Sequence, residues 1–227
     1  MRIAIVGHGR LGQVLARTLA VRHPVVCPGR DPIPLDVDVV WLAVPDAALA
    51  EVARRLPPHA VALHSAGTFD HHILRPHRPA VRLHPMMTFA RGAPAPSGVV
   101  PAGLMGDPEA VGVARSLAAD LGWTPFDIPG DVRLVHAAAV LAGNGAAQLT
   151  VDAMTLLRAA GVDADVLGPL VRASVAAVLK DGPDARTGPA RRGDAGTLAR
   201  ARTALIEADL PAILPLFDAL AARGRVN

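Results

Sequence analysis

The first half of the chain alternates short apolar runs with patterns of helical period. The apolar runs are four to seven residues long and rich in Val, Ile and Leu, which is typical of strands buried in a parallel sheet. Predicted strands lie at 2–6, 24–28, 39–44, 60–64, 81–84, 99–105 and 124–128. Helical patterns lie at about 10–21, 46–56 and 108–121. This order predicts an α/β fold with a doubly wound, mostly parallel sheet of the Rossmann type.

The pattern changes near residue 130, where strand-like runs stop. One long helical pattern ends at Gly161, and Asp194 is a good N-cap for a later helix. Further helices are predicted at about 163–180, 195–208 and 211–223. We therefore predict two domains: a dinucleotide-binding domain at 1–129, and an all-helical domain at 130–227 that binds substrate or forms a dimer.

The glycine loop directly after the first strand has the spacing of a dinucleotide site. Gly7, Gly9 and Gly12 fit G-x-G-x-x-G between a strand and a helix. In that context Gly7 permits a tight turn, Gly9 lets the backbone approach a pyrophosphate, and Gly12 allows close helix packing. The expected cofactor-binding set also includes the intervening loop residues and two residues after the third strand: His8, Arg10, Leu11, Val44 and Pro45.

The end of the second strand selects between NADP and NAD. Arg30 offers a planar cation for a 2′-phosphate, whereas Asp31 could bind the ribose hydroxyls instead. NADP is favoured and NAD remains possible. Only residues 29–38 connect the second and third strands, which is too short for the usual crossover helix. A shallow adenosine side of the pocket is expected.

Composition excludes several classes of protein. The hydrophobic content of 51% and the charged content of 19% are those of a folded globular chain, and no uninterrupted apolar run reaches membrane-spanning length. The arginines are scattered, and four Phe, two Trp and no Tyr leave little for base stacking, so nucleic acid is not an expected partner. The lone Cys27 indicates a reducing, cytoplasmic setting.

Six short motifs in order resemble one known family. They are GHGRLG at 7–12, VPDAAL at 44–49, LHSAGT at 63–68, LHPMMTF at 83–89, HAAAVLAGNGAAQL at 136–149 and TGPARRGD at 187–194. Together they resemble the Rossmann-like proteins with a DUF2520 C-terminal domain, which are related to the 6-phosphogluconate dehydrogenase-like oxidoreductases. The resemblance implies an NAD(P)-dependent activity on a small substrate, often in a homodimer built through the C-terminal helices. Some such proteins reduce ketopantoate.

The chain departs from that family in ways that bear on chemistry. Val135 stands where a tyrosine is common, and the crossover helix is missing. Related hydroxyacid dehydrogenases use a lysine one turn before an asparagine. Asn144 matches the asparagine, but Val140 occupies the lysine position, and the only lysine is Lys180. A lysine mechanism is therefore not expected here.

Histidine is the best replacement as proton donor, because its ordinary pKa lies near neutrality. His84 ends a predicted strand at the edge where doubly wound sheets bind ligands, and Ser65 has the same placement. The pair also resembles the histidine and serine of prephenate dehydrogenases, in which the histidine contacts the reacting hydroxyl and the serine helps orient it. The alternative is that His84 only bonds backbone at a strand end.

Three residues of the helical half complete the candidate set. Asn144 could hold a substrate hydroxyl, although its flanking glycines are also suited to helix packing. His136 could face the same cleft or be a buried histidine with satisfied hydrogen bonds. Arg192 could clamp a carboxylate, or be a solvated loop residue beside the Asp194 cap. No metal site is expected, because His71, His72 and His77 lie in a Pro- and Arg-rich stretch that is typical of a solvent-facing loop.

The sequence thus predicts an NADP-dependent reductase of a small keto acid or related carbonyl or imine compound. His84, Ser65 and Asn144 are the predicted catalytic residues, with Arg192 and His136 on the substrate. The competing hypothesis is a non-catalytic nucleotide-binding or regulatory module, which the missing helix and the absent lysine both favour.

Overall fold

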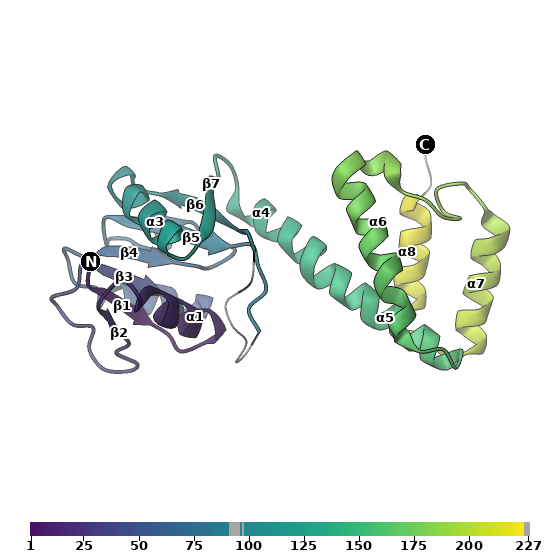
Figure 1. Ribbon diagram of the computed structural model, residues 1–227, viewed down its shortest axis with the longest axis horizontal. Coiled ribbons are helices and arrows are strands. Elements are labelled where there is room, and N and C mark those ends of the chain that lie inside the picture. The colour runs from purple at the N-terminus through teal and green to yellow at the C-terminus, as the bar shows by residue number, and fades with distance from the viewer. Residues whose placement is uncertain (91–95, 97, 225–227) are drawn as a thin grey trace. The chain divides into compact units, whose positions relative to one another are not determined.

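The computed structural model describes residues 1–90, 96 and 98–224. The chain forms two compact units, Met1–Leu141 and Ala142–Asn227 (Figure 1). The division falls within a helical segment, some residues after the last strand, because the first helix of the predicted helical half makes its contacts with the sheet unit.

The first unit is built on one seven-stranded sheet with the order β2-β1-β3-β4-β5-β6-β7. The strands from β2 to β5 are parallel, β6 runs antiparallel to β5, and β7 is parallel to β6. The strands are β1 (Ile3–Val6), β2 (Val25–Val26), β3 (Val39–Leu42), β4 (Val61–His64), β5 (Ala80–Pro85), β6 (Val100–Gly106) and β7 (Trp123–Asp127). The predicted mostly parallel Rossmann-type sheet is confirmed.

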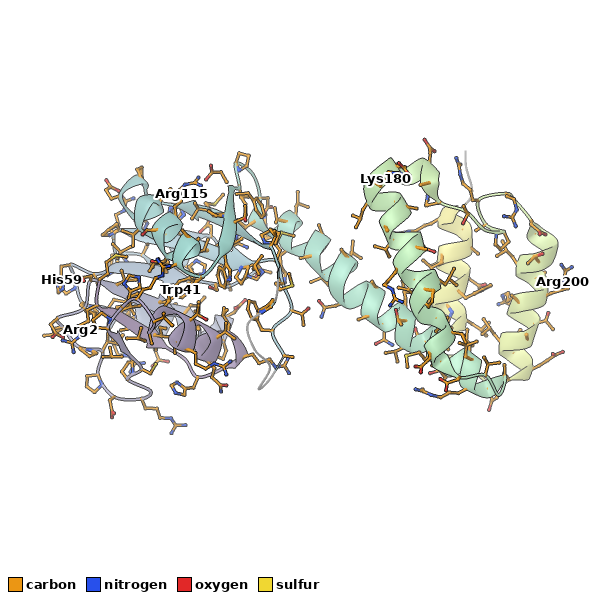
Figure 2. All side chains as sticks on the ribbon, in the orientation of Figure 1. Arg2, Trp41, His59, Arg115, Lys180 and Arg200 are labelled. Atoms are coloured by element: carbon orange, nitrogen blue, oxygen red, sulfur yellow. The ribbon has the colours of Figure 1, made fainter. Side chains whose placement is uncertain are left out.

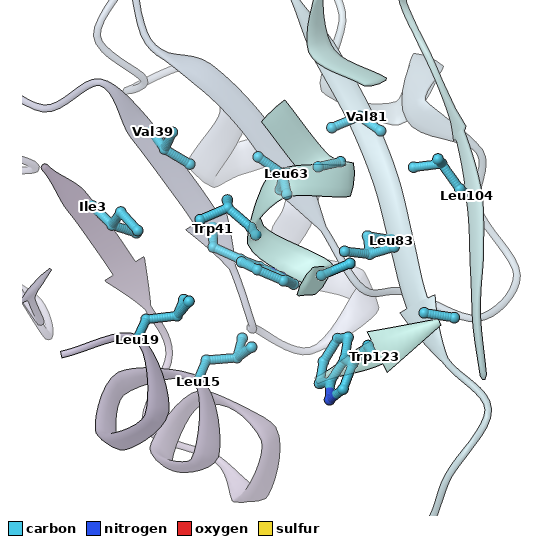
Figure 3. Packing of buried hydrophobic residues seen from close by; sticks show 14 of the residues in the cluster. Ile3, Leu15, Leu19, Val39, Trp41, Leu63, Val81, Leu83, Leu104 and Trp123 are labelled. Atoms are coloured by element: carbon cyan, nitrogen blue, oxygen red, sulfur yellow. The ribbon is translucent and has the colours of Figure 1, made fainter. Parts of the chain in front are cut away.

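Helices cover both faces of this sheet because alternate residues of each strand point to opposite faces. In β1, Ile3 and Ile5 join one buried cluster and Ala4 and Val6 join another. The first cluster lies under α1 and α3, with Trp41 edge-on to Trp123 (Figure 3). The helical segments of this unit are α1 (Arg10–Leu19), η1 (Asp46–Ala48), α2 (Leu49–Ala53), η2 (His71–Leu74), α3 (Pro108–Asp120) and α4 (Val132–Ala139).

The strand order places a ligand edge next to the glycine loop. The connections from β1 and β3 leave the sheet on opposite sides, so a crevice opens where these neighbouring strands end. The carboxyl ends of β4 and β5 lie along the same edge, because all four strands are parallel. Residues that follow these strands are therefore brought to one edge of the sheet. The structure describes every residue between β2 and β3, and none of them is helical, as the sequence predicted.

The second unit is helical, and its helices follow the predicted periodicity. The Asp194 carboxylate caps α7 by accepting the Thr197 N–H at 2.9 Å, as its position before the helix predicts. The helical segments are η3 (Val140–Gly145), which crosses the division, α5 (Ala146–Ala159), η4 (Ala164–Val166), α6 (Leu167–Asp181), η5 (Pro183–Ala185), α7 (Ala195–Glu207) and α8 (Leu214–Gly224). The segment η3 is a π-helical turn that the sequence pattern did not predict.

The helical unit leaves most of its apolar side chains exposed. Among its described residues only Leu205 is buried. The helix from Val132 to Ala159 is long and apolar enough to span a membrane, judged by length and composition alone, and its most apolar window has no buried residues. Core helices of soluble proteins meet the same criterion, so one such helix is weak evidence for a membrane span.

Candidate functional site

The glycine loop between β1 and α1 is held in place by close backbone packing. Gly7 has φ +115°, a conformation that favours glycine, and a Cβ there would overlap the Ala43 carbonyl oxygen. A Cβ on Gly12 would overlap the Gly7 carbonyl oxygen. By contrast, nothing lies within 4 Å of the Cβ position of Gly9. Two glycines therefore serve packing, and the third leaves open space at the N-terminus of α1.

A cavity of about 440 Å³ lies beside this loop, a size typical of small-molecule sites. The free N–H groups of the first turn of α1 adjoin it, and that turn carries no acidic residue, so an anion is favoured there. The arrangement fits the pyrophosphate of a dinucleotide. The lining residues are Gly7, His8, Gly9, Arg10, Leu11, Leu42, Ala43, Val44, Pro45, Asp46, Ser65 and Ala66. This list contains every residue of the predicted cofactor set except Gly12 and Arg30.

Arg30 lies outside the lining of this cavity. It is an exposed residue in the turn after β2, and its side chain makes no hydrogen bond to the described part of the chain. The turn itself is closed by the Asp31 N–H, which donates to the Pro28 carbonyl at 3.0 Å. No helix lies between β2 and β3 in the described residues, so none there places Arg30 against the cavity.

Ser65 follows β4 at the ligand edge, and its hydroxyl is already engaged. The oxygen accepts a hydrogen bond from the indole N–H of Trp41 at 2.9 Å, and the hydroxyl donates to the Leu83 carbonyl at 2.8 Å. The predicted role of orienting substrate through the hydroxyl does not match this geometry, because the only proton of the hydroxyl is committed to backbone. Ser65 instead ties β3, β4 and β5 together beside the cavity.

His84 lies near the end of β5, next to Ser65. Its Nδ1 donates to the Ser65 backbone carbonyl at 2.6 Å, since a carbonyl can only accept. Nε2 has no hydrogen-bond partner among the described residues and is not fully buried, so it is free to contact a ligand. Burial lowers the pKa of His84, and the nearby charge of Arg82 and the His136 ring lower it further against the opposing effect of the Ser65 bond.

His136 of α4 contacts His84, which the sequence alone did not establish. The ring centroids are 5.6 Å apart at 78°, an edge-to-face contact. The Nδ1 atom of His136 is buried without a partner, so the expected alternative of a fully satisfied histidine does not hold. The ring lies against Gly67, where a Cβ would overlap the imidazole. Gly67 is thus required for this contact, a role that no sequence motif signals.

Arg82 is the residue of this site that sequence reasoning missed. It is fully buried in β5, yet no carboxylate pairs with it in the part of the chain that the structure describes. Its guanidinium donates to the carbonyls of Ala66 at 3.1 Å, Gly67 at 3.1 Å and Gly103 at 3.2 Å. Burial lowers the pKa of Arg82 to about 10, so it remains a cation at neutral pH. It fixes the loop that holds both histidines.

The other candidates lie in the helical unit, apart from this cluster in the chain. Asn144 is exposed in the π-helical turn, and nothing lies within 4 Å of the Cβ position of neighbouring Gly143. Arg192 is exposed in the loop before α7. Lys180 is exposed in the last turn of α6 (Figure 2). The fold supplies no local geometry that assigns any of these three residues a role.

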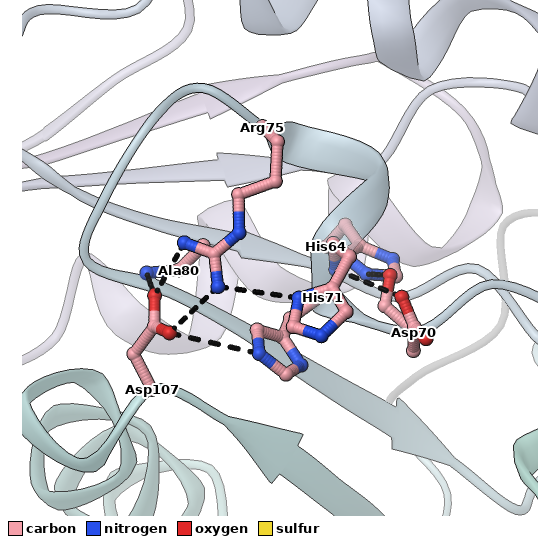
Figure 4. Close-up of polar contacts among 7 residues, drawn as sticks. His64, Asp70, His71, Arg75, Ala80 and Asp107 are labelled. Carbon is pink, nitrogen blue, oxygen red and sulfur yellow. Dashed lines mark hydrogen bonds and ion pairs between the residues drawn. The ribbon is translucent and has the colours of Figure 1, made fainter.

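The sequence suggested that the histidines after β4 face solvent, and this holds for His72, which is exposed, but not for His71. His71 is buried, with Nε2 3.7 Å from the Asp107 carboxylate, and Arg75 binds the same carboxylate at 2.9 Å (Figure 4). His64 accepts the Ala66 N–H at 3.2 Å and donates to the Asp70 carbonyl at 3.0 Å. No group of three or more potential metal ligands occurs among the described residues.

The sheet and its helices define a protein with a Rossmann-type α/β domain followed by a helical unit. The family described as Domain of unknown function (DUF2520) matches residues 100–223, and the chain belongs to this family. The resemblance inferred from the ordered motifs is thereby confirmed. No curated protein matches the sequence.

Several solved structures share the fold over nearly their whole length. A protein of Bacteroides fragilis described as a "putative NADP oxidoreductase" is 22% identical, with a TM-score of 0.81 over 98% of this chain and 97% of that one. An imine reductase of Streptomyces aurantiacus is 15% identical, with a TM-score of 0.72 over 99% and 95%. An imine reductase of Aspergillus terreus in complex with NADPH4 is 19% identical, with a TM-score of 0.69 over 98% and 92%. At these identities the likeness is one of fold.

Proposed function

We propose that this protein is an NADP-dependent oxidoreductase that reduces a small keto acid or a related carbonyl or imine compound. The observation that carries the proposal is the juxtaposition of the glycine-loop cavity with His84. Ser65 lines the cavity and its carbonyl orients the His84 ring, which leaves Nε2 free to contact a ligand. The cavity and a group that can transfer a proton are therefore connected through one residue, Ser65.

The cofactor is proposed to bind through its pyrophosphate at the N-terminus of α1. Gly9 lets the pyrophosphate come close to the backbone, while Gly7 and Gly12 allow the close packing that fixes the shape of the loop. A bound nicotinamide would supply hydride to the substrate carbon. NADP is favoured over NAD because Arg30 is available for a 2′-phosphate and because similar folds carry NADP in their names. A titration that gives tighter binding of NADH than of NADPH would overturn this preference.

His84 is the proposed proton-transfer residue. The Ser65 carbonyl accepts Nδ1–H in both charge states of the ring, so the proton that moves is the one on Nε2. In reduction, Nε2 gives its proton to the heteroatom of the substrate. Replacing His84 with Gln should lower kcat/KM for reduction at least about 100-fold. NADPH affinity, measured by fluorescence titration, should stay within a few-fold of the native value.

The substrate is proposed to be a small keto acid, with ketopantoate as the leading specific candidate on the strength of the family resemblance. An imine is the alternative, because the names of several proteins of similar fold describe imine reductases. Arg192 and Asn144 remain candidates for contacts to a substrate carboxylate and hydroxyl. A screen of NADPH oxidation with keto acids, cyclohexanone and cyclic imines would test the substrate class.

A second candidate function is a non-catalytic nucleotide-binding module. The observation that favours it is the exposed position of Arg30 without a crossover helix, which leaves the adenosine side of the cavity unsupported. This candidate predicts that NADPH binds but is not oxidised with any member of the substrate panel. Turnover of one member at a rate that depends on His84 would eliminate it.

The protein is further proposed to act in the cytoplasm as a homodimer joined through its helical unit. This unit buries a single side chain among its described residues, far fewer than a stable helical domain requires. A second copy of the same helices would cover the exposed apolar positions with matching apolar surface. The most exposed of these are Leu179, Leu170 and Val166, at 82%, 63% and 57%.

A further inference from the structure

The contact between His84 and His136 carries information on the substrate atom that the site can bind. Each ring has one nitrogen turned inward, and its other nitrogen is neither hydrogen-bonded to the described residues nor fully buried. The rings meet edge to face with centroids 5.6 Å apart, so the two side chains adjoin each other. The decisive question is which of these outward nitrogens carries a proton.

For His84 the inward nitrogen settles the tautomer. Nδ1 lies 2.6 Å from the Ser65 carbonyl oxygen and must carry a proton to bond it. The outward Nε2 is then an acceptor in the neutral ring and a donor in the protonated ring. Both charge states keep the inward hydrogen bond, so His84 can change its charge without losing a contact.

For His136 the inward nitrogen dictates the opposite tautomer. Nδ1 is buried against Gly67 with no acceptor within reach. Buried N–H groups without an acceptor are rare because they forfeit a strong hydrogen bond to water. The neutral ring therefore keeps its proton on the outward Nε2. In this tautomer the outward Nε2–H is a hydrogen-bond donor.

We propose that His84 and His136 together bind a carbonyl oxygen, and that the substrate is consequently a ketone, an aldehyde or a keto acid and not an imine. This inference rests on the proposed function. His136 donates from Nε2–H to one lone pair of the oxygen, and protonated His84 donates to the other. During reduction the carbonyl carbon receives hydride from the reduced nicotinamide, and the oxygen receives the proton of His84 Nε2. The products are an alcohol and a neutral His84, which is reprotonated from water.

An imine does not satisfy the same pair of donors. Its nitrogen has one lone pair when neutral and none when protonated, whereas a carbonyl oxygen has two. One of the two histidines would then be left without a partner in a partly buried site, which disfavours the complex. A protonated imine would also face a protonated His84. The site thus selects oxygen over nitrogen, in contrast to the imine reductases of similar fold.

The tautomers can be measured without any substrate. Long-range ¹H–¹⁵N spectra of uniformly ¹⁵N-labelled protein, assigned with His84→Gln and His136→Gln variants, report which ring nitrogen carries the proton. We expect Nδ1–H for neutral His84 and Nε2–H for neutral His136. A proton on Nδ1 of neutral His136 would overturn the inference.

The substrate preference is tested with variants of His136. His136→Gln retains an N–H donor, whereas His136→Phe has none and keeps a ring against Gly67. Relative to wild type, His136→Phe should lose at least about 100-fold in kcat/KM for 2-keto acids and cyclohexanone, and His136→Gln no more than about 10-fold. Binding of NADPH should be unchanged in both. Gly67→Ala, which pushes the ring away, should resemble His136→Phe in a protein that folds normally by circular dichroism.

Cyclic imines matched in ring size to the ketones complete the test. Wild-type protein should reduce the carbonyl compounds at least about 10-fold faster. If imines are reduced faster, the inference is overturned while the proposed oxidoreductase function stands. If NADPH binds and neither class is turned over, the proposed function fails and the inference fails with it. Equal loss of both substrates in His136→Phe would also overturn the selection of oxygen.

Discussion

At the scale of single residues, the chemistry of this site depends on the backbone partner of His84. The Ser65 carbonyl fixes the ring and its Nδ1–H, and Arg82 fixes the loop that contains that carbonyl. Neither contact involves a side-chain carboxylate, the usual partner of a catalytic histidine. The buried charge of Arg82 instead helps to hold the pKa of His84 below its ordinary value of 6.5.

The lowered pKa of His84 predicts a specific pH profile. Reduction requires the protonated ring, so kcat/KM should be constant at low pH and fall about tenfold per pH unit above the pKa of His84. Because burial lowers that pKa, the midpoint should lie below pH 6.5. Oxidation of the product alcohol requires the neutral ring and should show the reverse dependence. A midpoint above pH 7 in reduction would contradict this assignment.

Ser65→Ala separates the structural role of the hydroxyl from chemistry. The substitution keeps the backbone carbonyl that accepts from His84. It removes the acceptor of the Trp41 indole N–H, which belongs to a fully buried side chain. We expect the free energy of unfolding to drop by about 1–3 kcal/mol, and turnover at a temperature where the variant is folded to change only a few-fold. Chemical denaturation and kinetics together measure this. A loss of turnover as large as that of His84→Gln would restore the hydroxyl to the mechanism.

Sequence reasoning selected His84 and Ser65 as candidates because His84 ends a predicted strand at the ligand edge and Ser65 follows another. It could not identify the partners of the serine hydroxyl, since Trp41 and Leu83 belong to separate strands whose neighbours depend on sheet order. The same limit applied to His136 and Gly67, which are distant in sequence and meet only after α4 docks on the sheet unit.

At the scale of elements, different glycines of the loop serve packing and ligand contact. Gly12→Ala places a Cβ against the Gly7 carbonyl oxygen, so it should destabilise the protein measurably and abolish cofactor binding. Gly9→Ala is the matched control, because its Cβ position is open. It should fold with native stability yet bind NADPH at least about tenfold more weakly, since the methyl group intrudes on the pyrophosphate position. Thermal melts and fluorescence titrations distinguish the two. Native NADPH affinity in Gly9→Ala would argue against this cavity as the cofactor site.

The sequence predicted where strands and helices occur, but not the direction of every strand or the type of every helical turn. Periodicity predicted the strands of the sheet, and the ten-residue spacing from 29 to 38 correctly excluded a crossover helix. The antiparallel direction of β6 and the π-helical turn at η3 were not predictable. The first depends on how the chain returns to the sheet, and the second depends on a single extra residue in a helical turn, which periodicity does not resolve.

At the scale of the whole molecule, His64 couples the stability of the fold to pH. It is fully buried and bonded at both ring nitrogens, and burial lowers its pKa from 6.5 to about 4. Between these values the unfolded chain binds the proton more readily than the folded protein. Stability is therefore complete above pH 6.5 and is lost as pH falls toward 4, by up to about 3 kcal/mol.

Urea denaturation between pH 4 and 7 measures this effect. His64→Gln should flatten the decline, because glutamine can donate and accept without titrating. His59→Gln is the matched control, since His59 is exposed and its substitution should leave the slope unchanged (Figure 2). An identical slope in wild type and His64→Gln would show that His64 is not the titrating group.

The exposed apolar surface of the helical unit predicts a stable dimer. Light scattering after size-exclusion chromatography should give twice the 23.4 kDa of one chain at micromolar concentration. Leu179→Glu, at an 82% exposed position, should shift the equilibrium toward monomer, because a second copy cannot cover the new charge without desolvating it. Val21→Glu is the matched control, since it places the same charge at an 81% exposed apolar position of the sheet unit and should leave the dimer intact. A monomeric wild type would exclude the dimer.

The central claim is that this protein moves a proton through His84 beside a bound nicotinamide. The most direct measurement is single-turnover oxidation of NADPH by the wild-type protein and by His84→Gln, with saturating keto acid and with NADPH bound equally in both. We expect rapid oxidation by wild type and a rate at least about 100-fold lower in the variant. Equal rates in the two proteins, or binding of NADPH with no oxidation in either, would contradict the claim.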